Sequence, residues 1–236
     1  MSNKTVKHCL PKLNFIVNYK KEFWFIKNKY SDARKAIGKK RFGGIINFNI
    51  PEIAVDKYER MVKDVYRHTE NKREDVLPKL LKQKMIYQKK WLQFGSRFFR
   101  QMEEVTGLTW RKRKYDLYFL FSCFWGGDYD ENGNTIYVGP LLKHGDPLYV
   151  IFHELSHLLF WEFVHTHYTK GFIKRNHFRI WKLSEVLVNY PLLKISIKYR
   201  FPLIIPSTIK NADEIVKNFS AMSFCDIIQK ELKKAR

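Results

Sequence analysis

Apolar residues follow a helical period through most of this chain and a strand-like pattern in only one part of it. They recur every three or four positions from Ile53 to Val65 and from Leu77 to Met102, which predicts two amphipathic helices. Thr106-Gly107 is the expected end of the second helix, because glycine readily adopts the conformation that ends a helix. A closing pair of amphipathic helices is predicted within residues 211–234.

The pattern changes to that of β-strands between residues 115 and 138. Residues 115–124 are dense in aromatic and aliphatic side chains, and Thr135 to Val138 forms a second short run of this kind. Asn132-Gly133 lies between the two runs and suits a hairpin turn, whose central residues adopt positive φ angles. We therefore expect a mainly helical α+β fold that contains a small antiparallel sheet.

The most apolar helix is predicted to run from Pro147 to about His165. Proline is favoured at the first position of a helix, and large apolar residues surround the rest of this segment, so we expect burial on nearly every side. Another helix is predicted from about Asn176 to Tyr190, with Pro191 ending it. Residues 192–206 are expected to be extended or irregular.

Length and composition fit a globular protein. The 236 residues suffice for one large domain or two small ones, and a 45% apolar content is enough for a core. The chain lacks an uncharged apolar run of about eighteen residues, and its first residues lack the apolar core of a signal peptide, so we expect a cytoplasmic protein without a transmembrane segment. Three widely spaced cysteines argue against disulfides and against a zinc ribbon.

Positive charge is concentrated in the N-terminal half. The formal net charge is +21, and residues 1–114 hold 29 Lys and Arg against 11 Asp and Glu, whereas residues 115–236 hold 15 against 12. We therefore divide the chain into a basic, mostly helical region, residues 1–114, and a second unit, residues 115–236. A field of this sign attracts nucleic acid or another polyanion, such as an anionic membrane or an acidic protein. A lysine-rich solvated surface explains the charge equally well, because no nucleic-acid motif accompanies it.

The apolar helix contains an H-E-x-x-H sequence, formed by His153, Glu154 and His157. On a helix the two histidines project from one face, close enough to share one Zn²⁺ ion, with Glu154 beside them. Burial of two imidazoles and a carboxylate costs free energy, and a bound metal offsets this cost for all three groups. The alternative without metal is a pair of histidines that bond to backbone carbonyls.

A second carboxylate is predicted to lie among apolar side chains on the following helix. Glu185 shares a stripe with Phe178, Trp181 and Asn189 at helical spacing. A carboxylate in such surroundings requires a cation.

The helix with H-E-x-x-H, preceded by a hairpin and followed by a helix with S-E-x-x-x-N, resembles the gluzincin branch of zinc metallopeptidases over residues 115–195. The resemblance implies a zincin-like catalytic unit in which His153, His157 and Glu185 bind Zn²⁺. Asn189 then stands where the family often has an aspartate that supports a histidine ligand. The resemblance also implies that the strand near Gly126-Gly127 pairs with an extended peptide substrate through its edge.

The same residues account for hydrolysis of a peptide bond. Three protein ligands leave one position on Zn²⁺ for water, whose pKa falls towards ~7. Glu154 would remove a proton from this water as the general base and pass it to the leaving amine. Gluzincins commonly stabilise the oxyanion with a tyrosine or histidine, and Tyr190 is the candidate here, with Tyr199 and Arg200 as alternatives.

Two other interpretations stay open. A third histidine ligand, His177 or else His165 or His167, combined with the basic half of the chain, would resemble the SprT-like proteases that degrade protein crosslinked to DNA, although their usual cysteine zinc module is missing here. The other interpretation is a non-catalytic basic binding protein, in which the N-terminal half holds nucleic acid or a membrane surface.

Overall fold

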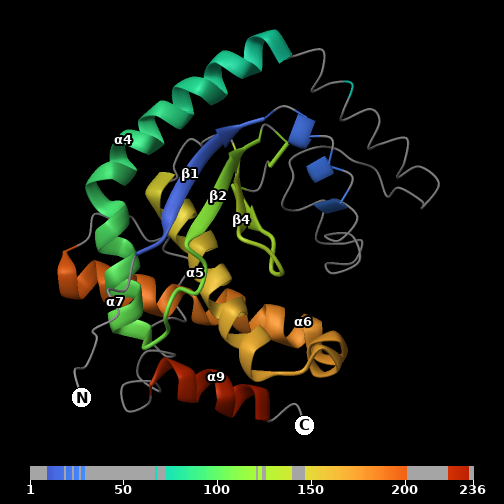
Figure 1. Ribbon diagram of the computed structural model, residues 1–236, viewed down its shortest axis with the longest axis vertical. Helices are drawn as coiled ribbons and strands as arrows, with labels where there is room; N and C mark the ends of the chain where they lie inside the picture. Colours follow the sequence, from blue (N-terminus) through green and yellow to red (C-terminus); the bar gives the residue numbers. More distant parts are fainter. Residues whose placement is uncertain are drawn as a thin grey trace, which may run out of the picture.

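The described part of the chain is a mainly helical α+β structure, as predicted (Figure 1). The computed structural model describes residues 10–18, 20–22, 24–26, 28–29, 67, 73–120, 122–123, 126–139, 147–200 and 223–233. Its helices are α4 (Arg73–Thr106), α5 (Pro147–His167), α6 (Lys170–Leu187), α7 (Asn189–Tyr199) and α9 (Phe224–Lys233). The described residues between 20 and 29 are also helical. The helix predicted from Ile53 to Val65 lies outside the described residues.

The sheet is mixed, and the prediction of an antiparallel sheet is wrong. Its order is β1 (Lys12–Val17), β2 (Lys114–Phe119), β4 (Thr135–Val138) and β3 (Gly127–Tyr129). Neighbouring strands are parallel except β3, which is antiparallel to β4. A turn between Asp130 and Gly133 does close a hairpin, but it joins β3 to β4 rather than β2 to β4, and the predicted positive φ angles of Asn132 and Gly133 are wrong. The sequence of β3, Gly-Asp-Tyr, has no apolar alternation, so the hydrophobic pattern could not reveal it.

The sheet packs against helical residues on both faces. Alternate residues of β3 and β4 place Tyr129 and Ile136 in the main core, which contains the buried side of α5. Tyr137 points to the other face, where it contacts Trp24 and Phe25. Strand β1 and helix α4 lie before residue 114, yet β1 pairs with β2, and α4 shares one core with α5. Among the described residues, the boundary that charge places at residue 114 therefore does not separate two cores.

Helix α4 connects the basic half to the core. It contains the predicted segment from Leu77 to Met102 and ends where predicted, at Thr106. Gly107 has a positive φ of 69°, and its N–H donates to the Glu103 carbonyl (2.8 Å), which closes the last turn. The rings of Phe98 in α4 and Phe152 in α5 stack with centroids 4.1 Å apart, so α4 supports α5 one residue before the H-E-x-x-H segment.

The elements after α5 differ from the prediction in two ways. Helix α6 begins at Lys170, six residues earlier than expected, because the Thr169 side chain accepts a hydrogen bond from the Phe172 N–H and caps it. Pro191 does not end a helix, since it lies in the first turn of α7, where its missing N–H needs no partner. Residues 192–199 are therefore helical rather than extended.

Parts of the C-terminal prediction cannot be compared with the structure. Residues 201–222 lie outside the described residues, and α9 matches the second of the two predicted closing helices. Each helix that the structure describes is too short or too polar to cross a lipid bilayer.

Candidate metal centre

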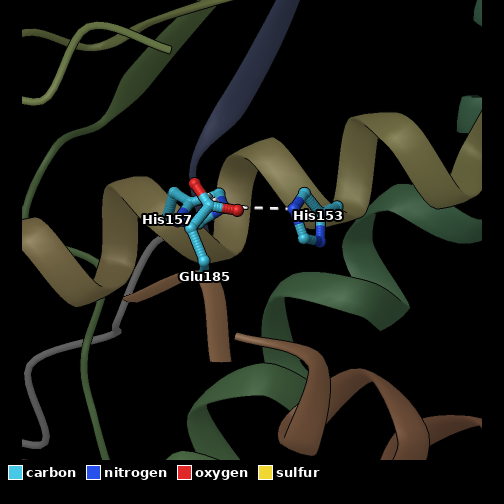
Figure 2. A group of neighbouring side chains, drawn as sticks. All are labelled: His153, His157 and Glu185. Carbon is cyan, nitrogen blue, oxygen red and sulfur yellow. Dashed lines mark hydrogen bonds and ion pairs between the residues drawn. The ribbon is translucent and has the colours of Figure 1, made fainter. Parts of the chain in front are cut away.

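The H-E-x-x-H segment lies in the middle of α5, and α6 brings a carboxylate to its two histidines (Figure 2). Nε2 of His157 is 3.1 Å from Nε2 of His153 and 3.6 Å from Oε1 of Glu185. The ligand atoms of all three residues lie within 4.8 Å of one another. Within the described residues this is the one group of histidine, cysteine and acidic side chains that could hold a metal ion. The structure thus brings together the three residues that the sequence predicted as ligands.

Two of the three separations of these ligand atoms are close to those in tetrahedral zinc sites. Nitrogen and oxygen ligands bind Zn²⁺ at about 2.0–2.2 Å, which places neighbouring ligand atoms of a tetrahedron about 3.3–3.6 Å apart. The observed 3.1 and 3.6 Å lie close to these values. The ligand atoms of His153 and Glu185 lie within 4.8 Å of each other, so zinc would require the half-buried Glu185 side chain to move towards His153.

Burial prepares both histidines to act as ligands. It lowers the pKa of His153 to about 4, and burial together with the neighbouring His153 lowers the pKa of His157 well below its usual value. Both rings are therefore neutral at pH 7, which is the form that binds a metal. Burial, with the nearby charge of Asp128, raises the pKa of Glu185 to about 7. A bound dication reverses this effect, because it favours the ionised carboxylate.

Ser184 selects the tautomer of His157. Its hydroxyl donates to the Trp181 carbonyl (2.8 Å), and its oxygen lies 3.1 Å from Nδ1 of His157. Because the hydroxyl proton is used elsewhere, the oxygen accepts the Nδ1–H of His157, which leaves the lone pair of Nε2 directed at the site. Tyr129 of β3 stacks on the same imidazole, with centroids 4.4 Å apart, and holds its plane.

Tyr149 and Asn189 surround the other histidine. The Tyr149 ring lies 5.6 Å from the His153 ring, and its hydroxyl donates to Oδ1 of Asn189 (2.9 Å). Asn189 also donates to the Glu185 carbonyl (2.9 Å). The Asn189 side chain lies beside His153 and raises the pKa of that ring, but burial lowers this pKa by more. Nδ1 of His153 makes no hydrogen bond of normal geometry to a described residue. Asn189 therefore lies where the resemblance placed it, beside one of the two histidines predicted to be ligands.

Glu154 is buried against the backbone of strand β3. A Cβ atom at Gly127 would lie 2.3 Å from Oε1 of Glu154, so only glycine lets the carboxylate occupy this place. Burial raises the pKa of Glu154 well above its usual value, the negative charges of Asp128 and Glu185 add to the effect, and Lys29 opposes it. Lys29 itself pairs with Asp128 (2.8 Å).

Replacement of Glu154 by glutamine should stabilise the metal-free protein in a pH-dependent way. The unfolded state releases the Glu154 proton near pH 4.5, whereas the folded state retains it, so the native protein loses stability as pH rises above this value. Glutamine does not titrate. We expect Glu154→Gln to raise the free energy of unfolding by more than about 1 kcal/mol at pH 8 and by much less at pH 5, since one pKa unit is worth about 1.4 kcal/mol. Denaturant unfolding with a chelator at both pH values measures the difference, and a pH-independent difference would contradict this explanation.

The remaining residues singled out in the sequence make contacts elsewhere. Tyr190, predicted to stabilise the oxyanion, lies parallel to Phe224 of α9 with centroids 6.5 Å apart, and that role stays a prediction. Nε2 of His177 lies 2.7 Å from a carboxylate oxygen of Glu131. Nε2 of His165 lies 3.1 Å from the backbone carbonyl of Glu131. Nδ1 of His167 bonds to the carbonyl of Phe163. Glu185 is the side chain that reaches the histidine pair.

Sequence reasoning gave no role to four residues that shape the site. Ser184 and Tyr149 had detectable signals, because Ser184 precedes a predicted ligand and Tyr149 lies one turn before His153 on the same helix. Gly127 and Tyr129 belong to β3, which is too short to show a pattern.

A scan against protein-family models, a search of the curated proteins and a search of the solved structures found no match to this chain. The chemistry and geometry of the site therefore carry the functional argument.

Proposed function

We propose that this protein is a zinc-dependent metallopeptidase of the gluzincin type, in which His153, His157 and Glu185 bind the metal and Glu154 is the general base. The observation that supports the proposal most directly is the convergence of the three ligand atoms within 4.8 Å on one side of α5. Metal-assisted hydrolysis needs metal ligands and a nearby base. The two neutral imidazoles and the Glu185 carboxylate would be the ligands, and the buried Glu154 carboxylate would be the base.

Zinc bound by these ligands would polarise the carbonyl of a peptide bond and acidify a water molecule. Glu154 follows His153 directly and is buried, and the nearby charge of Glu185 helps to raise its pKa, which supports Glu154 as the group that accepts the proton of the attacking water. Without metal, burial raises the pKa of Glu154, and a dication bound beside it would favour the ionised carboxylate, which is the form that accepts a proton.

The outer edge of β3, which pairs with no strand in the described part of the chain, supports a peptide as the substrate. The Gly139 N–H donates to the Gly126 carbonyl, and the Asp130 N–H donates to the Thr135 carbonyl. In an antiparallel pair every second residue bonds to the neighbouring strand, so Gly127 and Tyr129 direct their N–H and C=O groups away from β4. The Tyr129 carbonyl accepts a hydrogen bond from Nζ of Lys29, and the Tyr129 N–H donates to Oδ1 of Asp128. Gly127 thus offers backbone groups for an extended peptide beside Glu154.

Zinc analysis and a cleavage assay test the proposal. We expect the purified protein to bind about one zinc ion per chain and to cleave an unstructured protein. A chelator should stop cleavage, and added zinc should restore it. Absence of zinc uptake, or cleavage that is insensitive to the chelator, would refute the proposal.

Gly127→Ala should impair catalysis without removing the metal. The new methyl group would displace the Glu154 carboxylate, because the two cannot both occupy the observed space. We expect kcat to fall by about tenfold to a hundredfold, as is typical when a catalytic group is misplaced by about 1 Å, while zinc content stays native. Gly133→Ala is the matched control, since Gly133 faces Asp130 in the hairpin turn, away from Glu154. Equal activity of Gly127→Ala and the native protein would mean that the position of Glu154 is not critical.

A further inference from the structure

Helix α4 exposes a row of large apolar side chains. Leu81, Met85 and Leu92 are 45%, 70% and 86% exposed. Their spacings of four and seven residues place them on one side of the helix. Figure 1 shows α4 as an arc at the periphery of the molecule, and the exposed fractions show that this row faces solvent.

Basic residues flank the apolar row. Between residues 76 and 102, α4 contains seven lysines and arginines and no acidic residue. Lys82 and Lys89 are exposed on one flank of the row, and Lys84, which is half-buried, lies on the other flank by helical geometry. Part of the excess of positive charge found in the sequence therefore lies next to exposed apolar surface.

We propose that this face of α4, defined by Leu81, Met85, Leu92, Lys82 and Lys89, docks on an anionic lipid bilayer. A helix that lies in a membrane interface inserts apolar side chains between lipid head groups and directs lysines at their charges. Nucleic acid would match the lysines alone and would leave Met85 and Leu92 in water. A bilayer with anionic lipid satisfies both kinds of side chain.

The position of α4 is compatible with an open metal centre during docking. The sheet order places β1 and β3 at opposite edges. Helix α4 packs on β1, whereas Glu154 lies against Gly127 of β3. Docking through the outer face of α4 therefore leaves the β3 edge away from the bilayer.

Co-sedimentation of the full chain with vesicles tests the inference. We expect binding to vesicles of phosphatidylcholine and phosphatidylserine, little binding to vesicles of phosphatidylcholine alone, and weaker binding as salt concentration rises. Leu92→Glu and Met85→Glu should each weaken binding at least about tenfold. Leu92→Ser, which adds no charge, should also weaken binding and so isolates the apolar contribution.

Ile197→Glu is the matched control, because Ile197 is 71% exposed but belongs to α7. It introduces the same charge and should leave vesicle binding unchanged. These side chains are exposed, so thermal unfolding should show intact folding in every variant. Failure of the native chain to bind the anionic vesicles, or equal weakening by Leu92→Glu and Ile197→Glu, overturns the proposal. Binding to duplex DNA but not to the vesicles would assign the charge to nucleic acid and overturns it as well.

Discussion

Glu154→Gln is expected to abolish peptide hydrolysis while the protein keeps its zinc. Glutamine has nearly the same shape as glutamate and fits the space beside Gly127, but it cannot accept a proton from water. We expect kcat to fall by at least about 10²–10⁴-fold, the usual contribution of a general base. The measurement is the cleavage rate of an unstructured protein together with the zinc content of the same sample.

Glu162→Gln provides a matched control on the same helix. Glu162 accepts hydrogen bonds from the Tyr115 hydroxyl and the Arg111 N–H, so it supports the fold rather than the ligand group. Its substitution should leave kcat close to the native value at a temperature where the variant is folded. If Glu154→Gln were as active as the native protein, Glu154 would not be the base, and the non-catalytic interpretation of the chain would gain support.

The predicted ligand group depends on local spacing, which explains why the sequence sufficed for it. His153 and His157 are one turn apart on a helix, so their common direction follows from helical geometry alone. The prediction of Glu185 depended on a second helix that packs against the first. Its helical spacing from Trp181 and Asn189 indicated which face of that second helix is turned towards the histidines. The resemblance to gluzincins supplied the pairing of these two helices.

The sheet could not be predicted to the same degree, because its pairing is set by distant residues. Parallel pairing of β1 with β2 joins residues about a hundred positions apart, and no local pattern encodes this contact. The start of α6 was missed for a different reason. Lys170-Gly171 has the composition of a loop, and the cap from Thr169 that starts the helix is a single side-chain contact.

The choice between a glutamate and a histidine as the third ligand leads to opposite results for two variants. In the structure Oε1 of Glu185 is 3.6 Å from Nε2 of His157, whereas His177 pairs with Glu131. We therefore expect Glu185→Gln to weaken zinc binding at least about a hundredfold, since removal of even a supporting group costs ten- to a hundredfold. His177→Ala should leave zinc affinity unchanged. Competition with a chromophoric chelator measures both affinities.

A folding defect cannot account for the expected loss of zinc in Glu185→Gln. Burial raises the pKa of Glu185 to about 7, so without metal the native carboxylate destabilises the folded state at neutral pH, and the neutral amide removes this cost. Metal-free Glu185→Gln should therefore unfold at the same temperature as the metal-free native protein or at a higher one. The three-histidine interpretation predicts the reverse, with native zinc affinity in Glu185→Gln and a large loss in His177→Ala. His177 is about half exposed, but its ring stacks on the buried Trp161, so thermal unfolding of His177→Ala should accompany the measurement of its zinc affinity.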